Sequence, residues 1–413
     1  MKTSIVVLIF AIGGILAHKV RYDNHKLYRL NPKTNEALEQ LKQLEENDLE
    51  IKFWNDLRGK NHFVDILVPS EKIEEFEKFV RGFEIDLKLI NTNIQEVIDA
   101  EKTNKRSTGM SWTAYNSLET IVDWMDSLAT EYPDKVTKIT VGKTYEGRDI
   151  NGVKLSFNSN NTNNAVFIEA NIHAREWITS AVVTWILNEF LTSTDAGVRN
   201  LAESHDWYIV PVLNVDGFQY TKTTDRMWRK TRTPYGKCYG VDPNRNWGYH
   251  WNEGGTSKNP CSDSYLGPAP FSEECTRTTS KYLSTIADKL IGYIGFHSYS
   301  QLLLIPYGHS PAHVENYDQL EEIGLKAAKS LAKRYGTQYT VGNIVETIYI
   351  ASGSSMDWVK GNYKTPVTYT YELRDTGRYG FLLPAKQIIP TAEETLDSLV
   401  TMFEEYDAQT KQI

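Results

Sequence analysis

Hydrophobic and polar positions divide the chain into two unequal parts. In the first hundred residues, short runs with alternating polarity are separated by amphipathic helical patterns. Strands are expected at residues 26–30, 51–54, 62–67 and 85–90, and helices at 36–45 and 71–83. This β-α-β-β-α-β order predicts a small α+β open sandwich with both helices on one face of an antiparallel sheet.

The larger part, from about residue 111 onward, alternates amphipathic helices with continuous apolar runs, which are typical of strands buried on both faces. Helices are expected at 117–131, 178–191, 272–290, 316–335 and 384–406, and strands at 136–144, 151–156, 165–170, 207–213, 292–297 and 367–371. The pattern predicts an α/β fold with a mixed, mostly parallel sheet flanked by helices. Ligands of such folds bind at the carboxyl ends of the strands.

The first 17 residues have the pattern of a signal peptide. Lys2 supplies the positive start, residues 4–15 are apolar, and Ala17 is a small residue at a plausible cleavage point. A membrane anchor is the alternative. Since no later apolar run approaches the length that crosses a bilayer, we expect a secreted protein that does not span a membrane.

A polar connector separates the two parts. A helical pattern at 94–102 is followed by the basic pair Lys105-Arg106 and then by Ser-Thr-Gly. Such a segment is typical of an exposed linker that proteases reach. We therefore expect residues 18–106 to be a pro-segment, released by a trypsin-like cut after Arg106, and residues 107–413 to be the second domain. An ordinary solvated linker is the alternative.

Composition narrows the choice of partners and compartment. A formal charge of -8 on 413 residues argues against nucleic acid as the main partner. Of the three cysteines, Cys238 and Cys261 lie in loop-like sequence, whereas Cys275 lies in a helical pattern. A secreted protein favours one disulfide, and we expect it between Cys238 and Cys261, with Cys275 as a small buried side chain. Asn160 begins a glycosylation sequon whose use is open.

His173 and Glu176 follow the apolar run at 165–168 and precede a helical pattern. This spacing lets an imidazole nitrogen and a carboxylate oxygen reach one cation, and a catalytic zinc takes three such ligands and leaves a fourth position for water. The pair alone is a weak signal, because a glutamate at a helix start also favours the helix dipole. His297, which ends the run 291–296, is a candidate third ligand, with a satisfied core histidine as the alternative.

Further charged residues end apolar runs or lie in polar loops. Glu372 closes the run 367–371, where a lone carboxylate is costly unless it is paired or takes part in chemistry, and beside a metal it would suit a general base. Arg229 and Arg245 lie in loop sequence and could hold carboxylate groups by paired hydrogen bonds. Solvated surface arginines are the alternative for both.

Four separated motifs then point to a known family. They are His-Ala-Arg-Glu-Trp at 173–177, Val-Asp-Pro-Asn-Arg-Asn-Trp at 241–247, His-Ser-Tyr-Ser-Gln at 297–301 and Tyr-Glu-Leu-Arg-Asp-Thr-Gly-Arg-Tyr-Gly at 371–380. In this order they resemble the motifs of zinc metallocarboxypeptidases of the pancreatic, digestive type, carboxypeptidases A and B. The resemblance covers nearly the whole chain from residue 107, and residues 18–106 resemble the activation segment of that family.

The resemblance implies one zinc ion per chain, held by His173, Glu176 and His297. It implies that Glu372 is the general base, which takes a proton from the attacking water and delivers it to the leaving amine. Arg229 matches the arginine that stabilises the oxyanion of the tetrahedral centre.

It also implies a set of residues that bind the end of a peptide. Asn244, Arg245 and Tyr349 match the group that grips a free C-terminal carboxylate, which would make the enzyme an exopeptidase. Tyr349 lies in a stretch with small residues that suits a closing loop. Arg175 and Tyr299 would contribute to the next subsite.

The side-chain pocket is expected to be apolar. In the family, an acidic residue at the position that matches Met356 marks enzymes that remove terminal lysine or arginine, and Ile344 and Ile348 match further apolar lining. A terminal aromatic or aliphatic residue is therefore favoured, because an unpaired ammonium group would be costly there. Glu346 could supply an anion if its side chain turned inward, but a position in water is the favoured one.

The expected protein is a monomeric, secreted pro-carboxypeptidase of the A type. Its partners would be peptide or protein substrates and an activating trypsin-like protease, and the resemblance suggests the gut lumen as its location. A carboxypeptidase B-like enzyme is the nearest alternative. A non-catalytic zinc- or peptide-binding protein, or a purely structural secreted domain, would leave Glu372 and Arg229 without a purpose.

Overall fold

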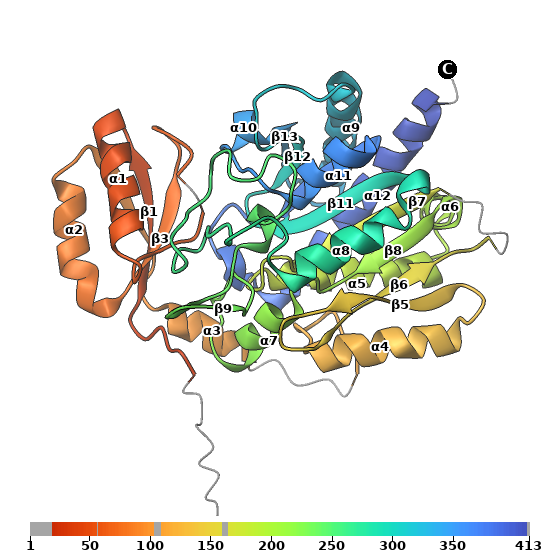
Figure 1. Ribbon diagram of the computed structural model, residues 1–413, viewed down its shortest axis with the longest axis horizontal. Coiled ribbons are helices and arrows are strands. Elements are labelled where there is room, and N and C mark those ends of the chain that lie inside the picture. Colours follow the sequence, from red (N-terminus) through yellow and green to blue (C-terminus); the bar gives the residue numbers. More distant parts are fainter. Residues whose placement is uncertain (1–18, 56, 103–108, 159–163, 411–413) are drawn as a thin grey trace, which may run out of the picture.

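The computed structural model describes residues 19–55, 57–102, 109–158 and 164–410 (Figure 1). The expected signal peptide, the Lys105-Arg106 cleavage site and the sequon at Asn160 lie outside the described residues. Within these ranges, each helix is too short or too polar to cross a bilayer.

The N-terminal domain has the predicted order of strands and helices. It consists of β1 (Lys26–Pro32), α1 (Asn35–Asn47), β2 (Lys52–Phe53), β3 (Val64–Val68), α2 (Ile73–Arg81) and β4 (Ile85–Asn91). The strands form an antiparallel sheet in the order β2-β3-β1-β4. Both helices lie on the side of this sheet that faces away from the larger domain (Figure 1).

Alternation along β1 and β3 gives this sheet two apolar faces. Tyr28 and Ile66 pack in one cluster with Phe76 of α2. Leu27 and Leu67 pack on the opposite face, in a cluster that includes residues of the larger domain. Because side chains alternate between the faces of a strand, one sheet can bind its own helices and dock on a second domain.

The larger domain is built on a mixed sheet of eight strands in the order β13-β12-β14-β11-β7-β8-β6-β5. Strands β14, β11, β7 and β8 at its centre are parallel to one another, whereas β5, β6 and β12 each have an antiparallel neighbour. The strands are β5 (Val136–Lys143), β6 (Asp149–Leu155), β7 (Ala165–Ala170), β8 (Asp206–Val210), β11 (Leu290–Ser298), β12 (Leu302–Ile305), β13 (Thr340–Asn343) and β14 (Val367–Leu373). The predicted mixed α/β class is confirmed.

Helices flank this sheet (Figure 1). The helix α3 (Ile94–Lys102) connects the two domains, and the larger domain contains α4 (Leu118–Glu131), α5 (Trp177–Thr192), α6 (Ala196–Ser204), α7 (Val215–Thr223), α8 (Glu274–Ser284), α9 (Tyr317–Tyr335), α10 (Ile344–Thr347), α11 (Ser355–Tyr363) and α12 (Ile388–Thr410). The pattern of hydrophobic and polar positions did not predict β12, β13, α6, α7, α10 or α11.

Two predicted elements continue well beyond the residues at which the observed ones end. The strand expected at 207–213 ends at Val210, because Pro211 has no N–H to continue the ladder. The helix expected at 272–290 ends at Ser284, and its last apolar position, Leu290, begins β11 instead.

The cysteines are arranged as the sequence led us to expect. A disulfide joins Cys238 and Cys261 across 23 residues of sequence. Cys238 lies in a short hairpin of β9 (Pro234–Tyr235) and β10 (Cys238–Tyr239), and Cys275 is a buried free thiol at the start of α8.

Candidate metal centre and substrate cleft

Three neighbouring parallel strands, β7, β11 and β14, end at the same edge of the central sheet. The loop after β7 carries His173 and Glu176, His297 is the second-last residue of β11, and Glu372 lies directly beside His297 in β14. The parallel pairing therefore brings together residues that are up to about two hundred positions apart in the sequence.

The loop after β7 is folded by Asn171. This residue has a positive φ of 49°, and its side-chain amide donates to the backbone oxygens of His173 at 3.3 Å and Glu176 at 3.0 Å. These bonds close residues 171–176 into a compact turn that ends where α5 begins, with Glu176 at the N-cap. The turn directs the side chains of His173 and Glu176 toward His297 at the end of β11.

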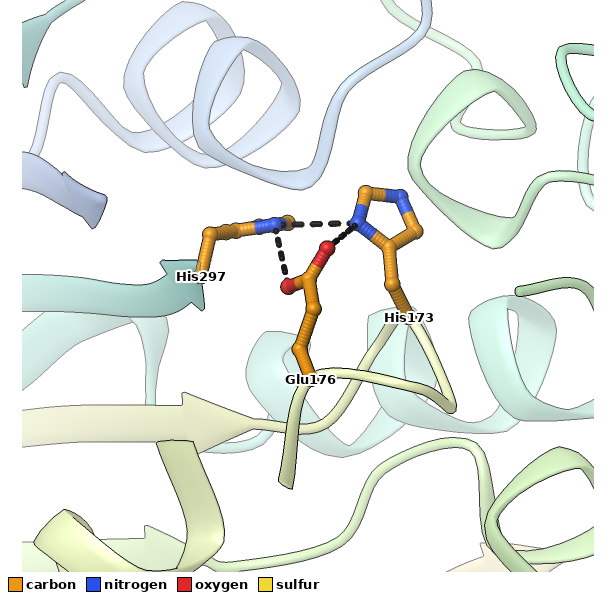
Figure 2. Close-up of side chains that lie close together, drawn as sticks. All are labelled: His173, Glu176 and His297. Carbon is orange, nitrogen blue, oxygen red and sulfur yellow. Dashed lines mark hydrogen bonds and ion pairs between the residues drawn. The ribbon is translucent and has the colours of Figure 1, made fainter. Parts of the chain in front are cut away.

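Figure 2 shows the three side chains converging from two elements, with His297 at the tip of its strand. Nδ1 of His173 lies 2.8 Å from a carboxylate oxygen of Glu176 and 3.1 Å from Nδ1 of His297, which is 3.3 Å from the other oxygen of Glu176. One ligand atom from each residue lies within 4.8 Å of the others, and all three side chains are buried. Two imidazoles and a carboxylate at these distances fit a catalytic zinc site.

A residue that the sequence analysis did not single out supports this cluster. The carboxylate of Asp242 lies 3.1 Å from Nε2 of His173, the nitrogen that faces away from the cluster, and accepts from Arg229 at 2.7 Å. Although burial opposes its ionisation, Arg229 and His173 hold the pKa of Asp242 well below its usual value. Such a partner orients a metal-binding imidazole and selects its tautomer. Asp242 follows a loop rather than an apolar run, so periodicity gave no signal for it.

Glu372 lines the same cleft as the cluster and is half-buried. Burial raises its pKa to about 8, while His297 lowers it and the charge of Glu176 raises it further. A carboxylate with a raised pKa beside three metal-binding groups has the properties of a general base. Arg229 lines the same cleft, with a guanidinium nitrogen 3.9 Å from a carboxylate oxygen of Glu176.

The residues expected to grip a terminal carboxylate also line this cleft. Asn244 and Arg245 lie in a 3₁₀ turn, Pro243–Arg245, and Tyr349 follows α10. Nε of Arg245 donates to the backbone oxygen of Gly255 at 2.9 Å, which fixes the plane of the guanidinium group. This group lies 6.0 Å from the centre of the Tyr349 ring.

Next to these groups the cleft is apolar. Ile344, Ile348 and Met356 line it, as the sequence led us to expect. The side chain of Glu346 is half exposed, and its carboxylate lies 3.2 Å from His313 on the outer surface. Glu346 is absent from the residues that line the cleft in the described part of the chain, so the inward orientation is not adopted.

Arg175 and Tyr299 also line the cleft. Nη1 of Arg175 is 3.4 Å from the carboxylate of Asp263, which lies two residues after Cys261 of the disulfide. Tyr299 is buried and donates its hydroxyl hydrogen to Asp65 of the N-terminal domain at 2.7 Å.

The N-terminal domain forms one wall of the cleft. Residues on and after β2, among them Lys52, Trp54 and Arg58, line it together with the metal-binding cluster. Nη2 of Arg58 donates to the hydroxyl of Ser300 at 3.2 Å, and the ring of Trp54 packs against Phe381 with centroids 5.3 Å apart. The two domains therefore contact each other at the cleft and both contribute to its lining.

Comparisons with known proteins agree with this geometry. The family model described as zinc carboxypeptidase matches residues 121–398, and the model described as carboxypeptidase activation peptide matches residues 28–101. The chain is 46% identical to zinc carboxypeptidase A 1 of Anopheles gambiae, with 98% of this chain and 95% of that protein covered. It is 37% identical to carboxypeptidase B of Rattus norvegicus, with 95% and 96% covered.

The fold matches a solved structure over nearly its whole length. The crystal structure of carboxypeptidase A from Helicoverpa armigera superposes with a TM-score of 0.86 at 28% identity, covering 95% of this chain and 100% of that one. Both domains, the strand-end cluster and the family matches lead to one conclusion. The chain belongs to the zinc carboxypeptidase family and carries the activation peptide of a zymogen ahead of its peptidase domain.

Proposed function

We propose that this zymogen is a secreted exopeptidase of the A type, which removes aromatic or aliphatic residues from the C-terminus of peptides. One observation carries the proposal: the metal-binding cluster and Glu372 lie in a cleft whose neighbouring wall is formed by Ile344, Ile348 and Met356. The chemistry therefore lies beside a pocket that suits an apolar side chain.

In this mechanism His173, Glu176 and His297 would hold the zinc ion, and the chemistry it would supply is Lewis acidity toward the scissile carbonyl and toward water. Glu372 accepts the proton of the attacking water and passes it to the leaving amine. Arg229 donates hydrogen bonds to the carbonyl oxygen as it becomes negative, and removal of such a donor typically costs about 3 kcal/mol. Asp242 keeps both His173 and Arg229 in place, because it bonds to each of them.

Binding of the free C-terminus falls to Arg245, Asn244 and Tyr349. The planar guanidinium of Arg245, already fixed by Gly255, can take a carboxylate through paired hydrogen bonds. An internal peptide bond offers no such anion, so this grip restricts hydrolysis to the last residue. Arg175 and Tyr299 would contact the peptide upstream of that bond.

The apolar preference follows from desolvation. The charged group of a lysine or arginine side chain would lose its water on entering the pocket and would find no carboxylate there to pair with. This loss costs several kcal/mol. Met356 is 2% exposed and supplies no charge, and the carboxylate of Glu346 is bonded to His313 outside the cleft. A B-type preference is the alternative, and the similarity to both carboxypeptidase A and B relatives leaves it to experiment.

The N-terminal domain would keep the enzyme inactive on long substrates by covering the cleft. Cleavage by a trypsin-like protease after Arg106 would separate residues 18–106 from a catalytic domain of residues 107–413, after removal of residues 1–17 on secretion. We expect the enzyme to act as a monomer, and its relatedness to digestive enzymes favours the gut lumen.

The test is hydrolysis by the trypsin-treated protein of a peptide panel that differs only in the last residue. Terminal Phe, Leu and Tyr should be released, whereas Arg and Lys should be released at least roughly a hundredfold more slowly. Faster release of Arg than of Phe would replace the A-type proposal with the B-type alternative. A peptide ending in phenylalaninamide serves as the control, because it lacks the carboxylate that Arg245 would bind.

A further inference from the structure

A carboxylate lies buried in the middle of the central sheet. Glu169 of β7 is 0% exposed and pairs with Gly295 of β11. Its Oε1 accepts hydrogen bonds from the hydroxyls of Tyr293 and Ser355, both at 3.1 Å. No lysine or arginine among the described residues forms an ion pair with Glu169, and its Oε2 has no hydrogen-bond partner among them. Such burial is unfavourable, so the position requires an explanation.

Ser355 connects Glu169 to the substrate cleft. It is the first residue of α11, where backbone N–H groups have no partner within the helix, and its N–H donates to Oδ1 of Asn244 at 2.9 Å. The amide nitrogen of Asn244 therefore faces the other way and lies 3.4 Å from Nε2 of His297. Asn244 lines the cleft in this orientation, and because its amide nitrogen carries two N–H groups, it can donate to an anion as well as to His297.

The floor of the pocket is built on the same unit. Met356 follows Ser355 directly, and its sulfur contacts the hydroxyl of Thr370 at 3.4 Å. A Cβ on Gly295 would lie 3.3 Å from that hydroxyl and 3.4 Å from Oε1 of Glu169. Because the strand has a glycine here, the carboxylate, the threonine and the start of α11 fit together closely.

We propose that Glu169 is a positioning residue of this site. By accepting the hydrogen bond of Ser355 it fixes the first turn of α11, which orients the amide of Asn244 toward the terminal carboxylate of a substrate and sets the depth of Met356. Glu169 itself touches neither substrate nor metal. The inference rests on the proposed role of Asn244 and adds a residue that acts through it.

The first test compares two variants of the activated, zinc-loaded enzyme. Glu169→Met has nearly the same size but offers only a weakly accepting sulfur, so KM for a peptide ending in Phe should rise roughly tenfold while kcat stays within about twofold. Glu169→Gln keeps an acceptor oxygen for Ser355, so its KM should stay within about threefold of the wild type. Equal damage by both variants would mean that the charge, rather than the acceptor, matters, and would overturn the proposal.

The second test asks whether the effect passes through Asn244. In an Asn244→Ala background, Glu169→Met should raise KM by less than about twofold further, because coupled residues are not additive. A full further loss would place the action of Glu169 elsewhere and contradict the proposal. Asp206→Leu is the control: Asp206 is a buried carboxylate of β8 that bonds to Ser156 and Lys154 away from the cleft, and its loss should leave KM unchanged.

A binding measurement separates this inference from the proposed function. Calorimetry should show that free phenylalanine binds the wild-type enzyme and binds Glu169→Met roughly tenfold more weakly, with equal zinc content. If the wild type binds and Glu169→Met binds equally well, the role of Glu169 is wrong and the proposed function stands. If the wild type neither binds phenylalanine nor cleaves the peptide, the proposed function fails, and this inference fails with it.

Discussion

The hydroxyl of Tyr299, in the peptidase domain, donates a 2.7 Å hydrogen bond to the carboxylate of Asp65, in the activation domain. Asp65 is fully buried and also accepts from Nε of Arg29 at 2.7 Å, which fixes its orientation. Burial and the charge of Asp65 raise the pKa of Tyr299 well above its ordinary value, so the tyrosine stays a donor. A side chain proposed to contact substrate is thus held by the domain that covers the cleft.

Asp65→Ala should raise the activity of the intact zymogen on long peptides before any activating cleavage. The change removes a hydrogen bond to a charged acceptor, worth about 1.5–3 kcal/mol, and the partner of Arg29, so the domain should lift from the cleft more often. We expect the rate on a hexapeptide, measured with a trypsin inhibitor present, to rise roughly tenfold.

Two controls make this prediction specific. After activation, the variant and the wild type have the same peptidase domain and should have the same rate. Asp86→Ala removes an exposed ion pair with Lys33 in the same domain. This change should leave the hexapeptide rate of the intact zymogen as low as that of the wild type. An unchanged hexapeptide rate for intact Asp65→Ala would show that the Tyr299 contact does not restrain the domain.

Glu372 should control the acid limb of the pH profile. As a base it must be ionised, so activity falls as the pH drops through its pKa. Burial raises this pKa from 4.5 to about 8, and a bound zinc ion favours the charged form. The limb of kcat/KM should therefore lie between these two values.

Glu372→Gln provides the corresponding measurement. It should lower kcat by roughly 10²–10⁴-fold, retain one zinc per chain and lose the acid limb. A variant that kept the wild-type limb would show that another group titrates there.

Asp242 should matter for metal affinity although it does not belong to the metal-binding cluster. Asp242→Asn leaves a poorer acceptor for His173 and Arg229, and loss of such an outer partner typically weakens metal affinity by about 10–100-fold. Competition with a chromophoric chelator measures this affinity. The control is Asp216→Asn, a buried carboxylate paired with Arg148 away from the cluster, which should bind zinc like the wild type.

Met356→Asp should change the preferred terminal residue. A carboxylate on the pocket wall would pair with a lysine or arginine head and would be left unpaired by phenylalanine, so the ratio of kcat/KM for Arg over Phe should rise at least roughly a hundredfold. Glu346→Gln is the matched test of the outer acid and should change that ratio by less than about twofold. A large effect of Glu346→Gln would mean that this side chain turns into the pocket when substrate binds.

Much of this site could be predicted because its residues end apolar runs. His173 and Glu176 follow a buried strand, whereas His297 and Glu372 lie near the ends of two others, and parallel strands bring their carboxyl ends to one edge. The fold of the activation domain could be predicted equally well, because polar and apolar residues alternate along its strands and its helices are amphipathic.

Other features could not be predicted from the order of polar and apolar residues along the chain. The contact of Asp65 with Tyr299 joins residues 234 positions apart in different domains. Glu169 lies inside an apolar run, and nothing in the sequence around it explains a buried carboxylate there. The explanation comes from the hydrogen bonds that Ser355 and Tyr293 donate to it. β12 has only four residues, which is too short for its period to be distinguished from a loop.

The central claim is that two imidazoles and a carboxylate hold the ion on which hydrolysis depends, and release of C-terminal phenylalanine by the activated protein tests it most directly. We predict one zinc per chain, loss of release after dialysis against a chelator, and recovery on adding one equivalent of zinc. His297→Ala should bind less zinc and should not recover. Full activity in the chelated protein, or in His297→Ala without bound metal, would contradict the account.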